Sequence, residues 1–194
     1  CTLLFCTVLY ATLANWYSSY IDCVFSLVYL IACLVAERVD RPRELALRYA
    51  ATMALALGAT AVLFLPSALN LLEGAESGFG LKALVNPKPI LTPPYLPAFF
   101  GIGTKVAVAD AIVPYLFTSA LALVLAVLAL VRPGLSRRRR LALIILVGAP
   151  LLGCMLEGPM TIWSCLRYAS SFYFRHSYTV SFALVICARE GYAS

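Results

Sequence analysis

The sequence predicts an all-α fold, a polytopic transmembrane bundle of about six helical spans. Its 194 residues are 62% hydrophobic and only 12% charged, with a mean hydropathy of +0.91, whereas a soluble domain carries about 25% charged residues. Apolar runs long enough to cross a hydrocarbon core of about 30 Å recur along the chain. These observations exclude a soluble globular domain. The net charge of +6 is concentrated in short segments between the runs, which indicates membrane orientation and not nucleic-acid binding.

The first 36 residues are apolar except for an insert around Asn15 to Asp22. A single helix over this stretch would measure about 54 Å at 1.5 Å per residue, so we expect a turn inside it. The interpretation is a first span at 1–13, an aromatic turn, and a second span at 20–36. Because the chain begins within an apolar run and ends just after another, we interpret it as an internal fragment of a longer protein.

Four further apolar runs predict the remaining spans of one transmembrane domain. The third span is expected at 46–66, with its end at Pro66, and the fourth at 111–131. A fifth, short span at 141–156 contains Pro150, which predicts a kink, and the sixth runs over 174–189.

Two short segments hold nine arginines and predict the orientation of the bundle. They are Arg38, Arg41, Arg43 and Arg48 after the second span, and Arg132, Arg137, Arg138, Arg139 and Arg140 before the fifth. Since short cytoplasmic loops carry an excess of Lys and Arg, loops 37–45 and 132–140 are predicted to be cytoplasmic. The alternate connections then face outward, among them the 67–110 connection.

The outer loop 67–110 is long for a connection without regular structure, which usually indicates a function. Six prolines lie in it or at its entry, Pro66 included, and Phe99 and Phe100 supply apolar surface. We expect a stiff, partly embedded element that covers an outer cleft.

Carboxylates near the outer face are the first catalytic candidates, because a carboxylate at membrane depth is costly and tends to mark a functional path. Asp22 and Glu73 are favoured over Asp110 and Glu157. If several converged, they would suit a divalent metal or a general base. The alternative is that each lies in the headgroup zone and is satisfied by water.

A second outer cluster predicts substrate binding through Arg167, Tyr173, Arg175 and His176. Two guanidinium groups flanked by aromatic rings would suit a lipid-linked phosphate. The alternative is a set of snorkelling anchors within an aromatic belt. Lys105, at the exit of the outer loop, is expected to help position the acceptor together with Glu73.

No metal or disulfide framework is predicted. The single histidine has no partners at ligand spacing, and the seven cysteines include no C-x-x-C pair. Only a pairing of Cys154 with Cys165 is left open.

Four collinear blocks resemble the YfhO family of bacterial integral membrane proteins. They lie at 13–30, around Asn-Trp-Tyr; at 64–74, around Leu-Pro-Ser; at 100–105, Phe-Gly-Ile-Gly-Thr-Lys; and at 172–182, around Tyr-Phe-Arg. The resemblance implies a GT-C-like fold and transfer of a sugar from a polyprenyl-phosphate donor to a cell-wall polymer acceptor, such as lipoteichoic acid, on the outer face of the cell membrane. It also implies that the catalytic carboxylate lies in an outer loop upstream of Cys1.

The predicted function is therefore an outer-face glycosyltransferase in contact with membrane lipids, its requirement for a divalent metal left open. Two alternatives remain. In a transporter or lipid flippase, Asp22 and the kinked fifth span would line a substrate path. A non-catalytic membrane scaffold would leave the outer cleft empty.

Overall fold

The computed structural model describes residues 2–73, 84, 88–90, 100, 119–166 and 174–192, and its regular elements there are helices. The predicted all-α class is confirmed. In chain order the helices are α1 (Thr2–Ala14), α2 (Trp16–Ala36), α3 (Pro42–Glu73), α6 (Ala120–Val131), α7 (Arg137–Met155), α8 (Glu157–Trp163) and α9 (Ser177–Tyr192).

The turn between α1 and α2 consists of Asn15 alone, which makes it tighter than the sequence predicts. Asn15 has an extended backbone, and its side-chain oxygen accepts hydrogen bonds from the amides of Tyr17 (3.1 Å) and Ser18 (3.3 Å). Two of the donors that a helix start leaves unpaired are thereby satisfied. The second helix consequently begins at Trp16, which brings Trp16, Tyr17 and Tyr20 into regular helical positions.

The predicted helix end at Pro66 is wrong, because α3 continues through this proline to Glu73. A proline inside a helix removes one backbone hydrogen bond, yet membrane helices tolerate it when neighbouring groups compensate. Pro42 occupies the first position of the same helix, where proline is favoured because that amide needs no helical partner. In the same way α7 continues through Pro150 to Met155.

Three helix triplets form the core, and small side chains dominate their contacts. The first triplet is α1, α2 and α3, the second is α2, α7 and α9, and the third is α6, α7 and α9. Ala32, Ala56, Ala126, Ala142 and Ala183 are among the buried residues at these contacts. Small residues let helix backbones approach closely, which is the usual way in which membrane helices pack.

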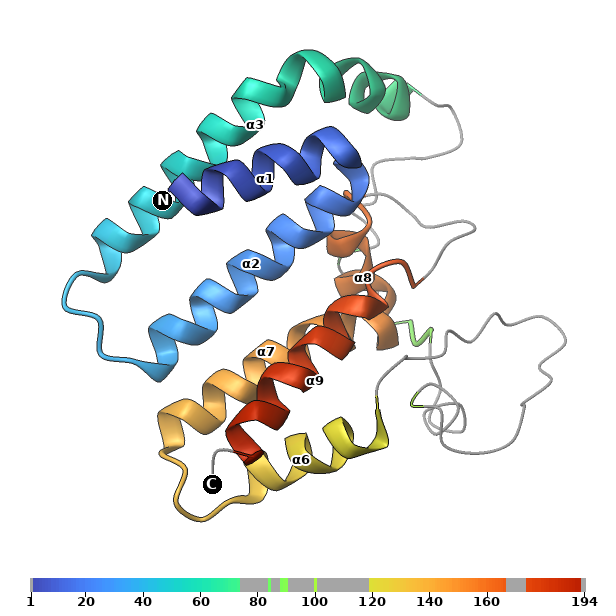
Figure 1. Ribbon diagram of the computed structural model, residues 1–194. Coiled ribbons are helices and arrows are strands. Elements are labelled where there is room, and N and C mark those ends of the chain that lie inside the picture. Colours follow the sequence, from blue (N-terminus) through green and yellow to red (C-terminus); the bar gives the residue numbers. More distant parts are fainter. Residues whose placement is uncertain are drawn as a thin grey trace, which may run out of the picture.

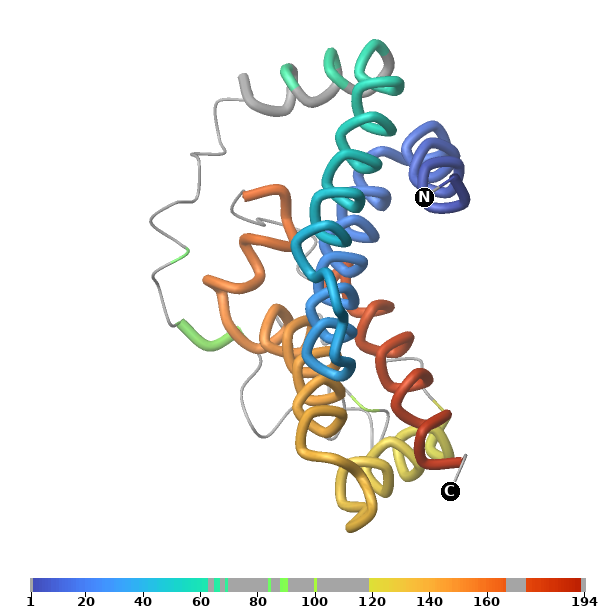
Figure 2. Tube along the Cα trace, turned by 90° about the vertical axis from the view of Figure 1, so that its left-hand side faces the viewer, coloured from blue at the N-terminus to red at the C-terminus, as the bar shows by residue number. Residues whose placement is uncertain are grey.

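Gly191 gives the clearest case of such close packing. A Cβ atom at this position would collide with the backbone oxygen of Leu125 in α6 and would lie 3.5 Å from Cβ of Ala129. Figure 2 shows the C-terminal part of α9 lying against α6. Glycine is therefore required where these two helices meet.

Polar groups lie inside the bundle and large apolar side chains face outward. Thr12 and Ser19 share a buried hydrogen bond of 2.9 Å between α1 and α2, and the Ser26 and Tyr49 hydroxyls lie 2.6 Å apart between α2 and α3. Leu3 and Val62, in contrast, are 82% and 84% exposed. This distribution is typical of a bundle surrounded by lipid, where interhelical hydrogen bonds and small residues hold the helices together.

Two helical segments in the described part of the chain are long and apolar enough to cross a membrane, Trp16–Ala36 and Pro42–Val62. Thr2–Ala14 and Ala120–Val131 are apolar but shorter.

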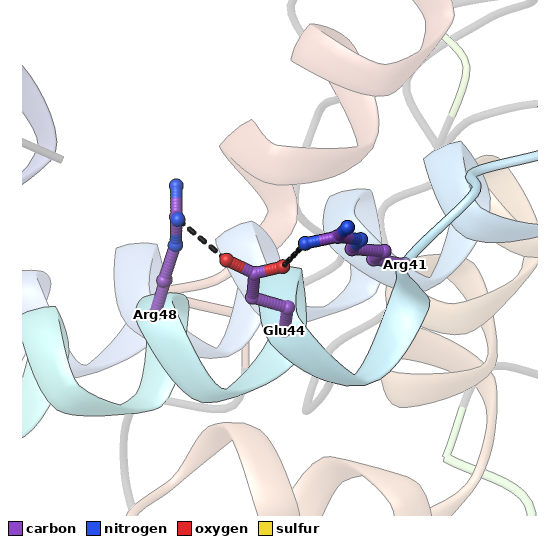
Figure 3. A network of polar contacts seen from close by, with 3 residues as sticks. All are labelled: Arg41, Glu44 and Arg48. Atoms are coloured by element: carbon purple, nitrogen blue, oxygen red, sulfur yellow. Dashed lines mark hydrogen bonds and ion pairs between the residues drawn. The ribbon is translucent and has the colours of Figure 1, made fainter.

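The bundle has two distinct ends. At one, which we call the α8 end, lie the α1–α2 turn, α8 and the start of α9; at the other, the arginine end, lie the α2–α3 and α6–α7 turns and the C terminus (Figure 1). Both predicted basic segments thus lie at the same end. Glu44 bridges Arg41 and Arg48 there at 3.4 and 2.5 Å (Figure 3), in exposed pairs that add little stability.

Candidate functional site

The α8 end of the bundle gathers most of the described residues that the sequence singles out. Its central element is α8, which lies in a connection where the sequence analysis places no helix. The backbone of residues 88–90 pairs with the turn before α8: the Ile90 amide donates to Met155 and the Glu157 amide donates to Lys88, at 2.9 and 3.1 Å. Part of the long connection thus lies against the site.

A buried imidazole lies at the junction of α7, α8 and α9. His176 is 2% exposed; its ring stacks on Trp163 with centroids 5.2 Å apart, and its Nε2 lies 3.4 Å from Sγ of Cys154. The ring also faces the backbone of Pro150 and Gly153. The ring of His176 is therefore packed inside the protein, at the start of α9.

Gly153 makes this arrangement possible. A Cβ atom here would collide with the indole of Trp163, at 2.6 Å from Nε1, and would lie 2.9 Å from Nε2 of His176. Cβ atoms essentially never approach heavy atoms so closely, so a larger residue would push both rings away. The stacked pair and the glycine form one packing unit.

The chain reverses sharply after α8 through two consecutive left-handed residues. Cys165 and Leu166 have φ angles of 58° and 59°, and the Leu166 amide donates to the Thr161 carbonyl at 2.9 Å. This is the hydrogen bond of a Schellman motif, in which glycine usually occupies the position held here by Cys165.

Arg175 extends from the turn that carries His176 and lies over an aromatic ring of α2. Its guanidinium carbon lies 4.9 Å from the centroid of the Tyr17 ring, a cation–π distance. Trp16 packs edge-on against the same ring, and the Tyr17 hydroxyl is within hydrogen-bonding reach of Ser164. Arg175 remains exposed, so the α8 end presents an oriented guanidinium to its surroundings.

Tyr20, one turn further along α2, ties that helix to α8. Its hydroxyl donates a 2.6 Å hydrogen bond to the carbonyl of Ile162. Because Tyr17 contacts Arg175 and Tyr20 contacts α8, the first turns of α2 position both flanks of the site.

An apolar groove opens beside this site, between α2 and α9. It has a volume of about 480 Å³. Its lining residues are Asp22, Phe25, Tyr178, Thr179, Ser181, Phe182 and Val185. Tyr178 donates a 2.7 Å hydrogen bond to Oδ1 of Asp22, and the rings of Phe25 and Phe182 meet edge-to-face at 5.9 Å. The groove therefore has one acidic residue and a mostly apolar wall.

The other predicted site residues are distributed as follows. Arg167, Tyr173, Lys105 and Asp110 lie outside the described residues, and Glu73 is described only as the last residue of α3. Glu157 begins α8. Within the described ranges, no group of three His, Cys, Asp or Glu residues could hold a metal ion, and no disulfide joins Cys154 to Cys165. The pairing left open for these two cysteines is thus not formed.

Two residues of the site are absent from the sequence analysis. Trp163 and Gly153 are an aromatic and a small residue in a chain full of such residues, so their type gives no signal. The sequence does carry a weak signal for α8, the helix that contains Trp163. Glu157 and Pro159 fall in its first turn, where acidic residues and proline are favoured.

Comparison with known proteins identifies one family. Residues 1–193 match the model of the family described as bacterial membrane protein YfhO. No curated protein and no solved structure matches the chain. The family match covers every element of the site described above.

Proposed function

Because the chain belongs to the bacterial membrane protein YfhO family, we propose that it is a GT-C-type glycosyltransferase of the cell envelope. In this proposal the enzyme takes a sugar from a polyprenyl-phosphate donor and transfers it to a cell-wall polymer such as lipoteichoic acid. The α8 end faces the outside of the cell membrane, and the arginine end faces the cytoplasm, as the excess of arginines at its two turns favours. The six helices other than α8 cross the bilayer.

The observation that carries the proposal is the oriented guanidinium of Arg175. It lies at the α8 end, is exposed, and is held over the Tyr17 ring at 4.9 Å. A planar guanidinium can bind two phosphate oxygens at once, and a preorganised one loses less side-chain entropy on binding. An arginine fixed in this way, three residues before the groove residue Tyr178, suits a phosphate that is attached to a lipid.

The proposed reaction is an in-line displacement at the anomeric carbon of the sugar. The acceptor hydroxyl forms the new carbon–oxygen bond while the bond from the anomeric carbon to the lipid phosphate breaks. The proton of the hydroxyl passes to a carboxylate upstream of Cys1, and the leaving phosphate takes up the electron pair. Arg175, joined by Arg167, stabilises the negative charge that develops on that phosphate.

His176 has a positioning role in this proposal, which differs from the direct contact that the sequence predicts. Because its ring is stacked on Trp163 and buried, it fixes the turn from which Arg175 extends. Asp22 lies at the groove and hydrogen-bonds Tyr178, which suits substrate positioning better than proton abstraction.

The experiment that tests the proposal uses the full-length protein in proteoliposomes. The donor is a polyprenyl-phosphate sugar labelled in the sugar, and purified lipoteichoic acid is the acceptor. We expect labelled polymer and free polyprenyl phosphate to appear in equal amounts. A transporter or flippase would instead move the intact donor across the bilayer without cleaving it, and a scaffold would do neither; either result would replace the glycosyltransferase.

A further inference from the structure

The α6–α7 turn concentrates the positive charge of the arginine end. Residues 132–140 contain five arginines and no acidic residue, whereas in 37–48 three acidic residues accompany four arginines. In the latter segment Glu44 pairs with both Arg41 and Arg48. The excess of positive charge therefore lies at the turn between α6 and α7 and at the start of α7.

This turn is held in place by packing and by hydrogen bonds. Leu135 packs against the buried cluster that α6, α7 and α9 share. Nη2 of Arg140 donates a 2.8 Å hydrogen bond to the carbonyl of Arg132, at the end of α6. The hydroxyl of Ser136 caps α7. The first turn of α7 is thus fixed relative to the end of α6.

Three exposed arginines form the first turn of α7, namely Arg137, Arg138 and Arg139. The amides at the start of a helix carry partial positive charge, so basic side chains there oppose the helix dipole and destabilise the helix. Orientation of the bundle requires arginines at this end of the protein, but not in the first turn of a helix. A bound anion would remove the unfavourable interaction, because both the guanidinium groups and the helix start attract it.

An exposed apolar strip follows these arginines along α7. Leu141 and Ile144 are 50% and 51% exposed. They come four and seven residues after Arg137, which places all three on one face of the helix. Leu152 continues the exposed strip toward the α8 end. A basic group followed by an apolar strip matches a phosphate headgroup that carries acyl chains.

We propose that the start of α7 binds an anionic phospholipid, with its phosphate at the arginines of 137–139 and one acyl chain along Leu141 and Ile144. A guanidinium group can donate to two phosphate oxygens at once. Basic residues at a membrane surface attract anionic lipids, and each strengthens binding about fivefold. The site lies at the opposite end of the bundle from Arg175, so it is independent of the proposed sugar transfer and is tested separately.

Photo-crosslinking of the full-length protein in phosphatidylcholine nanodiscs tests this inference. The probes are phosphatidylglycerol and phosphatidylcholine, each with a diazirine at the same position of one acyl chain. We expect phosphatidylglycerol to label the peptide that contains Leu141 and Ile144 at least about fivefold more strongly. Equal labelling of this peptide by the two lipids would overturn the inference. Displacement of the lipid by inorganic phosphate at constant ionic strength would also overturn it, because the site would then bind a free anion.

Two triple variants locate the binding site. The first changes the arginines of 137–139 to glutamine, and phosphatidylglycerol should then label α7 no more strongly than phosphatidylcholine does. The matched control removes the same charge from the other basic segment at this end, through R41Q, R43Q and R48Q. It should lower labelling of α7 less than twofold. Equal effects of the two triple variants would show that the total charge of the arginine end attracts the lipid, and would overturn the site at α7.

Thermal unfolding of the purified proteins separates lipid binding from folding. In a neutral detergent without added lipid, the glutamine variant of 137–139 should unfold at the parent temperature or above it, because it no longer opposes the helix dipole. Added phosphatidylglycerol should raise the unfolding temperature of the parent protein more than that of the variant. An equal rise in both proteins, or a lower unfolding temperature of the variant without lipid, would overturn the inference.

Discussion

Arg175 lies over the ring of Tyr17, with its guanidinium carbon 4.9 Å from the ring centroid. The two residues are far apart in the chain, and their contact joins the start of α2 to the turn before α9. Each of the two residues is held by its own local structure. Tyr17 lies in the first turn of α2, which Asn15 caps, and Arg175 precedes His176, whose buried ring stacks on Trp163. The position of the guanidinium is therefore a property of the fold.

Replacing the Tyr17 ring tests whether this contact orients Arg175. Tyr17→Leu removes the cation–π contact, which at an exposed site contributes about 0.5–1 kcal/mol, so we expect sugar transfer to slow about two- to fivefold. Tyr17→Phe retains the ring and should have a smaller effect. Transfer rates are compared at equal membrane abundance. If Tyr17→Leu and Tyr17→Phe gave the same rate of sugar transfer, the ring would have no orienting role.

Helix ends in this chain were predicted correctly from the length of an apolar run, but not from the position of a proline. The Asn15 turn could be predicted, because a single helix over the first 36 residues would be longer than the membrane is thick. The end of α3 could not, because proline usually ends a helix, whereas α3 continues through Pro66 to Glu73. Periodicity gave no help, since apolar residues cover most sides of these helices.

The packing unit around Gly153 predicts a strong effect of one added methyl group. Gly153→Ala would push the rings of Trp163 and His176 away from α7, and overpacking of this kind costs about 1–3 kcal/mol. We expect a lower unfolding temperature of the purified full-length protein in detergent. The same variant should also slow sugar transfer, because the turn that carries Arg175 would shift.

Gly148→Ala in the same helix is the matched control. A Cβ atom at Gly148 meets nothing within 4 Å, and alanine is the better helix former by about 1 kcal/mol. Its unfolding temperature should be equal to or above that of the parent protein. Equal destabilisation by both alanines would show that the Trp163–His176 stack is not the cause.

The arginine end is predicted to face the cytoplasm. A cysteine introduced at Asp40, in the α2–α3 turn, should resist a membrane-impermeant maleimide in intact cells, whereas one at Lys88, beside α8, should react. Both native residues are exposed, so a difference in labelling reports sidedness and not burial. Labelling of the native cysteines is measured on the parent protein under the same conditions and subtracted. The opposite pattern would move the site to the cytoplasmic face.

The candidate site could be predicted only in part. Asp22 and Arg175 stand out because charges are rare in an apolar chain, and the structure places both at the α8 end. His176 stood out as the single histidine of the sequence, and the structure places it in the buried interior beside Trp163. Gly153 and Trp163 depend on contacts between helices, which no local sequence pattern encodes.

The most direct test of the account is the rate of sugar transfer by Arg175→Lys. Lysine keeps the charge and can still anchor at the interface, but it lacks the planar fork that binds two phosphate oxygens. We expect the full-length variant, at normal membrane abundance, to transfer sugar at least about tenfold more slowly. Arg41→Lys, at the arginine end, should transfer at the parent rate. A parent rate for Arg175→Lys would contradict the account and assign Arg175 to the aromatic belt.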